Sequence, residues 1–150
     1  MANFDPFGKY VMVQLLNNTL ELFDARTLEK VKVINLAETK NDLPTKGDRR
    51  TADWSPEFSY FVCPNINDAR VPTAVILDRT RSFGIKDILI GHQSTISCCK
   101  FNPNIYEYNS DVTFILALGD SSGCLSLWRV GKYGTYDEPL FILSSPAKAE

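Results

Sequence analysis

A unit of about fifty residues occurs three times in this chain and holds almost all of its hydrophobic residues. Each unit begins with an aromatic residue, a small polar residue and a proline, in the triplets Phe4-Asp5-Pro6, Trp54-Ser55-Pro56 and Phe101-Asn102-Pro103. An apolar run, a polar turn and a second apolar run follow each triplet. A fixed period in this range indicates a repeat architecture, in which one unit cannot bury its own hydrophobic face and stacks on its neighbours.

Each unit is predicted to contain four β-strands. In the first unit we expect strands at residues 2–5, 10–16, 19–23 and 30–35, with a turn at Asn17 and Asn18. In the third unit we expect strands at residues 94–101, 112–119, 124–130 and 140–144, with a turn at residues 120–123. The β-branched and aromatic residues of these runs and the Asn and Gly residues between them favour strands joined by tight turns.

Residues 112–118 are apolar at nearly every position. An antiparallel strand with one solvated face alternates between apolar and polar residues, so this strand is expected to be covered on both faces. Sheets packed face to face around an axis provide such cover, whereas a two-sheet sandwich predicts cleaner alternation. The sequence therefore favours a β-propeller.

Gly91 and His92 are followed, 36 residues after the histidine, by Trp128. This spacing resembles the WD40 repeat, in which a Gly-His pair precedes the first strand of a blade and a Trp-Asp pair closes the third. The resemblance implies a buried hydrogen-bond chain from the indole N–H through a hydroxyl to the histidine and to an aspartate in a tight turn. The hydroxyl and turn-aspartate positions are aligned with Leu118 and Ser122, and Arg129 replaces the closing aspartate.

The earlier units keep less of this motif. In the first unit, Phe23 and Asp24 stand at the Trp-Asp pair, so the aspartate is retained and phenylalanine replaces the tryptophan. In the middle unit only the aspartate of this pair is retained, as Asp78. The resemblance assigns structural motif roles to Gly91, His92, Trp128, Phe23 and Asp24. His92 is the sole histidine, and a metal site needs partner ligands, so a structural role is expected for it.

A closer resemblance is to the Hir/HIRA family of histone chaperones, and it extends over most of the chain up to Val130. The matching stretches are residues 51–56, 59–62, 71–76, 89–92 and 99–103, with residues 4–10 fitting the preceding blade. Two pieces are more specific than WD40 repeats in general: the Pro-Thr-Ala entry at residues 72–74 after an asparagine-rich loop, and the spacing from Gly-His to the Lys-Phe-Asn-Pro run at residues 100–103.

The fold expected from this resemblance is all-β: a WD40-type β-propeller fragment of about three four-stranded blades from a seven-bladed propeller. The partial propeller would occupy residues 1–144, with blades at about 1–46, 47–91 and 92–144, and residues 145–150 would form a flexible tail. Such a slice leaves two blade faces and open sheet edges uncovered, so we expect it to be poorly stable alone.

The resemblance implies a function in binding rather than catalysis. Members of the family are non-enzymatic subunits of a nuclear complex that deposits histones H3 and H4 on DNA outside replication and regulates transcription. The implied partners are a ubinuclein-like subunit, other subunits of the complex, and H3–H4 contacted directly or through the complex. No cofactor is expected.

Candidate partner-binding residues are those in connections between strands that supply the arginine, asparagine and aromatic side chains common at interfaces. They are Arg49, Arg50, Asn65, Asn67, Arg70, Arg79, Arg81, Phe83 and Tyr106.

Composition argues against several other classes of protein. The chain has 16 basic and 18 acidic residues without a one-sided basic stripe, so direct sequence-specific DNA binding is not expected. No apolar run reaches 18 residues and the first ten residues do not read as a signal peptide, so no membrane association is expected. The four cysteines lack zinc-site or redox spacing and are expected to be buried, reduced thiols.

Three alternatives remain beside the chaperone interpretation. One is the WD40 subunit of the replication-coupled chromatin assembly factor, which would differ in its partners, and another is a generic WD40 protein-interaction scaffold. The third is an enzyme that uses the Asp, His and Cys residues present. The chain contains no nucleophile elbow, phosphate-binding loop or metal-ligand motif, so no catalytic, cofactor-binding or metal-binding residues are assigned.

Overall fold

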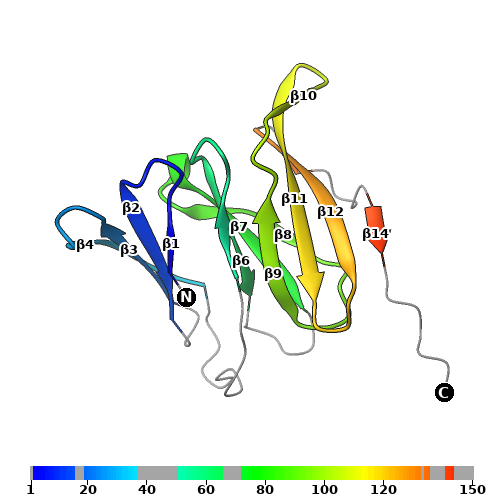
Figure 1. The fold of residues 1–150 in the computed structure, drawn as a ribbon, viewed down its shortest axis with the longest axis horizontal. Helices are drawn as coiled ribbons and strands as arrows, with labels where there is room; N and C mark the ends of the chain where they lie inside the picture. The colour runs from blue at the N-terminus through cyan, green and yellow to red at the C-terminus, as the bar shows by residue number, and fades with distance from the viewer. Residues whose placement is uncertain are drawn as a thin grey trace.

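The computed structural model describes residues 2–15, 19–36, 51–65, 72–132, 134–135 and 141–143. The expected turn at Asn17 and Asn18 and the expected tail at residues 145–150 lie outside these ranges. The described part is built almost entirely from antiparallel strands (Figure 1). Among the described residues, no helix is long and apolar enough to cross a membrane.

The strands form three sheets that follow one another along the chain. The first sheet contains β1 (Ala2–Phe4), β2 (Tyr10–Gln14), β3 (Thr19–Asp24) and β4 (Lys30–Asn35), paired in that order. The second contains β5 (Asp53–Trp54), β6 (Tyr60–Asn65), β7 (Thr73–Asp78) and β8 (Gly84–Leu89), with the short 3-10 helix η1 (Arg79–Arg81) between its last two strands.

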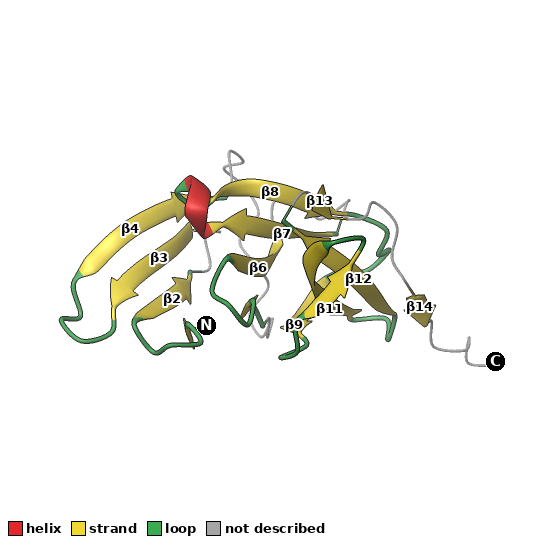
Figure 2. Cartoon of the chain, turned by 90° about the horizontal axis from the view of Figure 1, so that it is seen from above, coloured by secondary structure: helices red, strands yellow, loops and turns green. Residues whose placement is uncertain are grey.

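The third sheet has the same central order, with β9 (Ile96–Phe101), β11 (Asp111–Asp120), β12 (Leu125–Gly131) and β14 (Phe141–Leu143). It is extended by β10 (Tyr106–Tyr108), which pairs with β11, and by β13 (Gly134–Thr135), which pairs with β12. Figure 2 shows the sheets side by side, with η1 joining β7 to β8. The expected all-β fold, a partial WD40 propeller, is confirmed.

The three sequence triplets occupy the same place in the three sheets, at the turn that follows the first strand. The Asp5 N–H donates to the Tyr10 carbonyl at 3.0 Å, and the Ser55 N–H donates to the Tyr60 carbonyl at 2.8 Å. The Ser55 hydroxyl also accepts from the Tyr60 N–H at 2.9 Å. A small polar side chain at this position therefore closes the turn, as is common for Asp and Ser.

Strand register confirms that the sheets repeat one unit. In each sheet, one row of cross-strand partners joins the last residue of the first strand to the third strand. The rows are Phe4, Val11 and Phe23; Trp54, Phe61 and Leu77; and Phe101, Leu116 and Trp128. Phe23 and Leu77 thus stand where the third sheet has its tryptophan.

Two hydrophobic cores hold the sheets together. The first lies between the first and second sheets and includes Met12, Leu22 and Trp54, and the second lies between the second and third sheets and includes Ile76 and Trp128. The Trp54 ring lies 4.8 Å, centroid to centroid, from both Phe58 and Phe61. The middle sheet is therefore packed on both faces, and every residue of β7 is buried.

The expectation that residues 112–118 are covered on both faces is wrong for the structure as described. Phe114, Leu116 and Leu118 are fully buried against the second sheet, whereas Ile115 and Ala117 on the opposite face are only half-buried. In the described part of the chain, cover on both faces belongs to the middle sheet, because it alone has a described sheet on each side.

The cysteines divide into two pairs by exposure. All four are free thiols, as expected, and Cys63 and Cys99 are buried. Cys98 is exposed and Cys124 is half-buried, so the expectation that all four are buried is wrong for these two. Cys98 and Cys99 are adjacent on β9 and therefore point to opposite faces, which accounts for their different exposure.

Candidate interaction surface and its structural support

A chain of four hydrogen-bonded side chains lies inside the third sheet. The Trp128 Nε1–H donates to the Ser126 hydroxyl at 2.8 Å, and Ser126 Oγ lies 2.6 Å from His92 Nε2. His92 Nδ1 lies 2.8 Å from Asp120 Oδ2. All four residues are buried. One tautomer satisfies every group, with His92 Nδ1–H donating to Asp120 and the Ser126 O–H donating to Nε2.

The motif spacing in the sequence assigned two residues of this hydrogen-bond chain wrongly. The hydroxyl comes from Ser126 rather than the Leu118 position, and the turn aspartate is Asp120 rather than the Ser122 position. Leu118 is the strand partner directly opposite Ser126, and Ser122 donates its own N–H and O–H to Asp120. The hydrogen-bond chain is therefore complete in this sheet.

Asp120 also organises the turn between β11 and β12. Its Oδ1 accepts the Ser122 N–H at 2.9 Å, the Ser122 hydroxyl at 2.6 Å and the Cys124 N–H at 3.0 Å. Burial by itself would raise the pKa of this carboxyl, but the hydrogen bonds from Ser122, His92 and Cys124 outweigh burial and lower the pKa below 3.8. Asp120 is therefore held as a carboxylate that anchors both the turn and His92.

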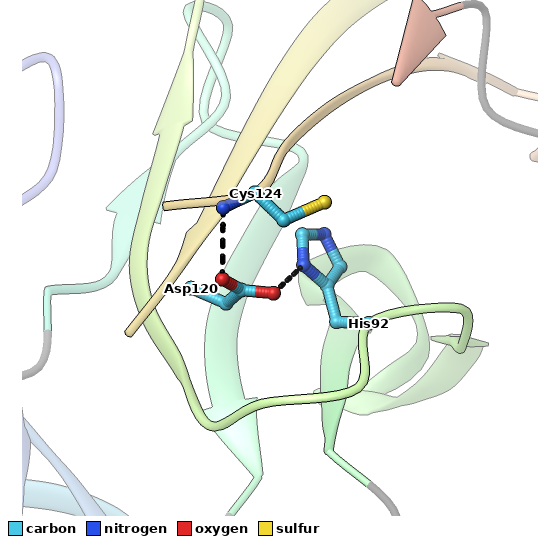
Figure 3. Close-up of side chains that lie close together, drawn as sticks. All are labelled: His92, Asp120 and Cys124. Atoms are coloured by element: carbon cyan, nitrogen blue, oxygen red, sulfur yellow. Dashed lines mark hydrogen bonds and ion pairs between the residues drawn. The ribbon is translucent and has the colours of Figure 1, made fainter. Parts of the chain in front are cut away.

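The same residues could be read as a metal site, and Figure 3 shows Cys124 beside His92 and Asp120. The candidate ligand atoms of these three residues lie within 4.8 Å of one another. Both ring nitrogens of His92 already have partners, so a metal ion would have to replace one of those bonds. The geometry favours a structural hydrogen-bond chain.

Ser126, His92 and Asp120 are also connected in the order of a hydrolytic triad. Ser126 is only 2% exposed, and its oxygen already accepts the indole N–H of Trp128. A nucleophile must reach a substrate carbonyl, which this hydroxyl does not. The hydrogen bonds that join Ser126, His92 and Asp120 therefore stabilise the third sheet.

The remaining motif residues have local roles. Gly91, directly before His92, has a φ of +127°, which side chains rarely adopt, so the turn into the third sheet needs glycine. Asp24 accepts the N–H groups of Arg26 at 2.8 Å and Thr27 at 3.0 Å, and these bonds lower its pKa below 3.8. Phe23 is half-buried, with the Lys30 ammonium 5.9 Å from its ring centroid.

The turns after the first and third strands of successive sheets meet at one end of the molecule, and we call this end the loop face. Phe7 of the first sheet packs edge-on against Phe58 of the second, with centroids 6.3 Å apart. Farther along, Arg81 and Thr80 of η1 line a pocket of about 410 Å³ together with Val112 of the third sheet. The loop face therefore spans all three sheets.

Arg79 and Arg81, two of the predicted partner-binding residues, are both exposed on the loop face. The Arg79 Nε–H donates to the Phe58 carbonyl at 2.8 Å, and its guanidinium lies 4.4 Å from the Phe58 ring centroid. Arg81 Nε lies 3.8 Å from Asp78 Oδ2, and the Arg81 side chain is 83% exposed. Arg79 is held in place, whereas Arg81 extends into solvent.

Phe83 was expected to be an exposed contact residue, and this expectation is wrong. It is 8% exposed and packs edge-on against Trp54, with centroids 6.1 Å apart. Ser82 and Phe83 both have left-handed backbone angles, with φ of 56° and 59°, and this double turn directs the ring into the core.

Tyr106 is 37% exposed on β10, where its carbonyl accepts from the Thr113 hydroxyl at 3.1 Å. Its neighbour Tyr108, which the sequence did not single out, is 42% exposed and lies under the Arg129 guanidinium at 4.4 Å. The aromatic-x-aromatic pattern of residues 106–108 was the signal that could have identified this short strand.

Other predicted contact residues lie outside the described residues. They are Arg49, Arg50, Asn67 and Arg70. Asn65 is the last residue of β6, and its side chain is not described. Their part in binding stays a prediction.

Comparison with known proteins gives clear relatives. The chain is 29% identical over 127 residues to the histone transcription regulator slm9 of Schizosaccharomyces pombe, which covers 84% of the chain and 15% of that relative. It is 31% identical over 148 residues to protein HIR2 of Kluyveromyces lactis, which covers 91% of the chain and 16% of the relative. No family model matches the chain.

Protein hir1 of Schizosaccharomyces pombe is 28% identical over 126 residues, which covers 83% of the chain. The chain spans 13–16% of the length of these three relatives. The resemblance read from the WD40 motif and the flanking stretches is therefore confirmed, and the chain is a homologue of the Hir1, Hir2 and Slm9 histone regulators of the HIR family.

Proposed function

We propose that the chain forms consecutive blades of a larger WD40 propeller that serves as an interaction scaffold in a HIRA-like histone chaperone complex. The blades would occupy about residues 1–46, 47–91 and 92–144 of a seven-bladed ring. The complex would act in the nucleus, deposit H3–H4 on DNA independently of replication and regulate transcription. The scaffold would bind a ubinuclein-like subunit and other subunits, and would contact H3–H4 directly or through them.

The observation that carries this proposal is the combination of its relatives and its loop face. The relatives are named as histone transcription regulator and Hir proteins. The loop face offers an exposed arginine, Arg81, and the exposed aromatic residues Phe7, Tyr106 and Tyr108. Arginine and aromatic side chains dominate binding energy at protein interfaces.

A rigid support under this face favours binding over catalysis. The two cores and the His92 hydrogen-bond chain fix the sheets that carry the turns. Loops on a stiff scaffold lose little conformational entropy when a partner binds. In this proposal the role of the molecule is to assemble a complex of proteins.

Affinity capture of the tagged full-length protein from nuclear extract tests the proposal. Recovery of H3–H4 with a ubinuclein-like subunit is the expected result. Recovery of replication-coupled assembly subunits instead would support the rival WD40 scaffold, and recovery of neither histones nor chromatin proteins would contradict a histone-regulating role.

A further inference from the structure

A second pocket, of about 270 Å³, opens on the loop face between the first and second sheets. Its deepest residues are apolar and buried, since Leu22, Phe58 and Phe83 are each less than 10% exposed. Tyr10 forms one wall, stacked on Phe58 with centroids 5.8 Å apart. Small-molecule sites typically have volumes of roughly 300–1,000 Å³, so this pocket suits one inserted side chain better than a metabolite.

The polar rim of this pocket carries positive charge. Arg79 and Lys32 line it, and no carboxylate is among its described lining residues. The Lys32 ammonium donates to the Ser82 carbonyl at 2.5 Å and lies 5.8 Å from the Phe83 ring centroid. Arg79 is likewise bonded to a carbonyl, that of Phe58. Carbonyl acceptors position these cations without cancelling their charge.

The other loop-face pocket lacks this one-sided charge. The pocket of about 410 Å³ between the second and third sheets is lined by Glu57 and Asp78 as well as by Arg81 and Lys132. Mixed signs at one rim do not select a partner of either charge. The pocket between the first two sheets is therefore the more selective one.

The backbone beside this pocket is held in uncommon conformations. Phe58, Ser82 and Phe83 all have left-handed φ angles, of 66°, 56° and 59°. Such angles are costly for residues other than glycine, and they gather at sites where surrounding contacts hold a binding geometry. Here they place two aromatic rings at the floor of the pocket and the Ser82 carbonyl at its rim.

We propose that this pocket binds a segment of a partner protein in which an aromatic or aliphatic residue is flanked by acidic residues. The apolar side chain inserts against Phe58 and Phe83, and a neighbouring carboxylate pairs with Arg79 and Lys32. The proposal rests on the proposed function only in that the chain acts as a binding scaffold, and it does not depend on which complex contains it.

Fluorescence anisotropy with the full-length protein tests this pocket. The probe is a labelled peptide with one phenylalanine flanked on each side by two aspartates, and its controls carry serine for phenylalanine or asparagine for aspartate. We expect saturable binding of the probe and binding about tenfold weaker for each control peptide, because one control removes the inserted ring and the other removes the carboxylates.

Variants of the protein locate the binding. Val31→Glu, on an exposed edge of the pocket, and the double variant Arg79→Gln with Lys32→Gln should each weaken the probe about tenfold. Arg81→Gln, on the same short helix but outside the pocket, should bind like the unsubstituted protein. Val31 is 54% exposed, so Val31→Glu decides the matter if the double variant does not fold.

Absence of saturable binding, or equal affinity of Val31→Glu and Arg81→Gln for the probe, would overturn the pocket proposal. Histone capture is scored separately. If histones are recovered but the peptide does not bind, only the pocket proposal fails. If the peptide binds but no histones are recovered, only the proposed function fails.

Discussion

The indole nitrogen of Trp128 lies 2.8 Å from the hydroxyl of Ser126, two residues earlier on β12. This bond connects the core between the second and third sheets to His92 and, through it, to the turn anchored by Asp120. The third sheet is thus braced by polar contacts from its buried face to its end.

Replacing Ser126 with alanine should destabilise the fold by about 2–6 kcal/mol, because each buried polar group left unpaired costs about 1–3 kcal/mol and two would be left. The groups are Trp128 Nε1–H and His92 Nε2. Ser122→Ala is the matched control, since Ser122 is exposed and should cost about 1 kcal/mol or less. Thermal unfolding of the full-length protein measures both, and equal destabilisation by the two variants would contradict the assigned roles.

Stability should depend on pH through Asp120. The pKa of this carboxyl is lowered in the folded state, so its stabilisation is fully present above its unfolded value of 3.8 and is lost as pH falls through the folded pKa. Asp120→Asn should therefore be less stable than the unsubstituted protein at pH 6, with a difference that shrinks toward pH 3. Parallel stability curves from pH 6 to pH 3 would show that Asp120 has no such role.

The four thiols should differ in reactivity. Burial raises the pKa of Cys63 to about 12 and raises the pKa of Cys99 well above 9.0, so neither forms a thiolate readily. Iodoacetamide at pH 8 should modify exposed Cys98 first and half-buried Cys124 next, and should spare Cys63 and Cys99 until denaturant is added. Peptide mass spectrometry reads each site. Modification of Cys63 as fast as Cys98 in the folded protein would count against the packing of the middle sheet.

At position 58, glycine should destabilise the fold no more than alanine does, although glycine is usually the more destabilising substitution. Loss of its ring should cost about 3–5 kcal/mol, because it packs on Trp54, Tyr10 and Arg79. Its φ of 66° penalises alanine by about 1–2 kcal/mol relative to glycine. Phe58→Gly should therefore be at least as stable as Phe58→Ala in thermal unfolding. A clearly more stable Phe58→Ala would mean that the turn does not keep this left-handed geometry.

The repeat and its strands could be predicted because the signals are local. The triplet at each first turn and the apolar runs after it depend on short-range chemistry, and the strands begin and end within a few residues of the expected bounds. Gly91 and His92 lie before the first strand of the third sheet, where the resemblance to the WD40 repeat places its Gly-His pair. The strand β10 was missed because its aromatic-x-aromatic signal covers three residues, which is shorter than the roughly four residues over which alternation indicates a strand.

The hydrogen-bond partners of His92 could not be identified from the residue spacing of the motif alone. The pairing of β11 with β9 shifts register between Gly119 and Asp120, and this irregularity sets where the turn begins. Two sequence signals pointed to the right residues: Asp120 opens an Asp-Ser-Ser-Gly turn, and Ser126 lies two residues before Trp128 on the same face of a strand. No sequence signal indicated that Phe83 is buried, because its burial follows from the left-handed backbone angles of Ser82 and Phe83.

The loop face is the surface on which partner recruitment depends in the proposed function. The direct measurement is quantitative affinity capture with the full-length protein carrying Arg79→Ala and Arg81→Ala. Gln93→Ala, at an exposed residue before β9 and at the opposite end of the third sheet, is the folded control. We predict that the double variant, compared at a temperature where it remains folded, recovers at least about threefold less histone H3–H4 and partner subunits, because exposed arginines anchor interfaces. Equal recovery by the double variant, the control and the unsubstituted protein would contradict this role of the loop face.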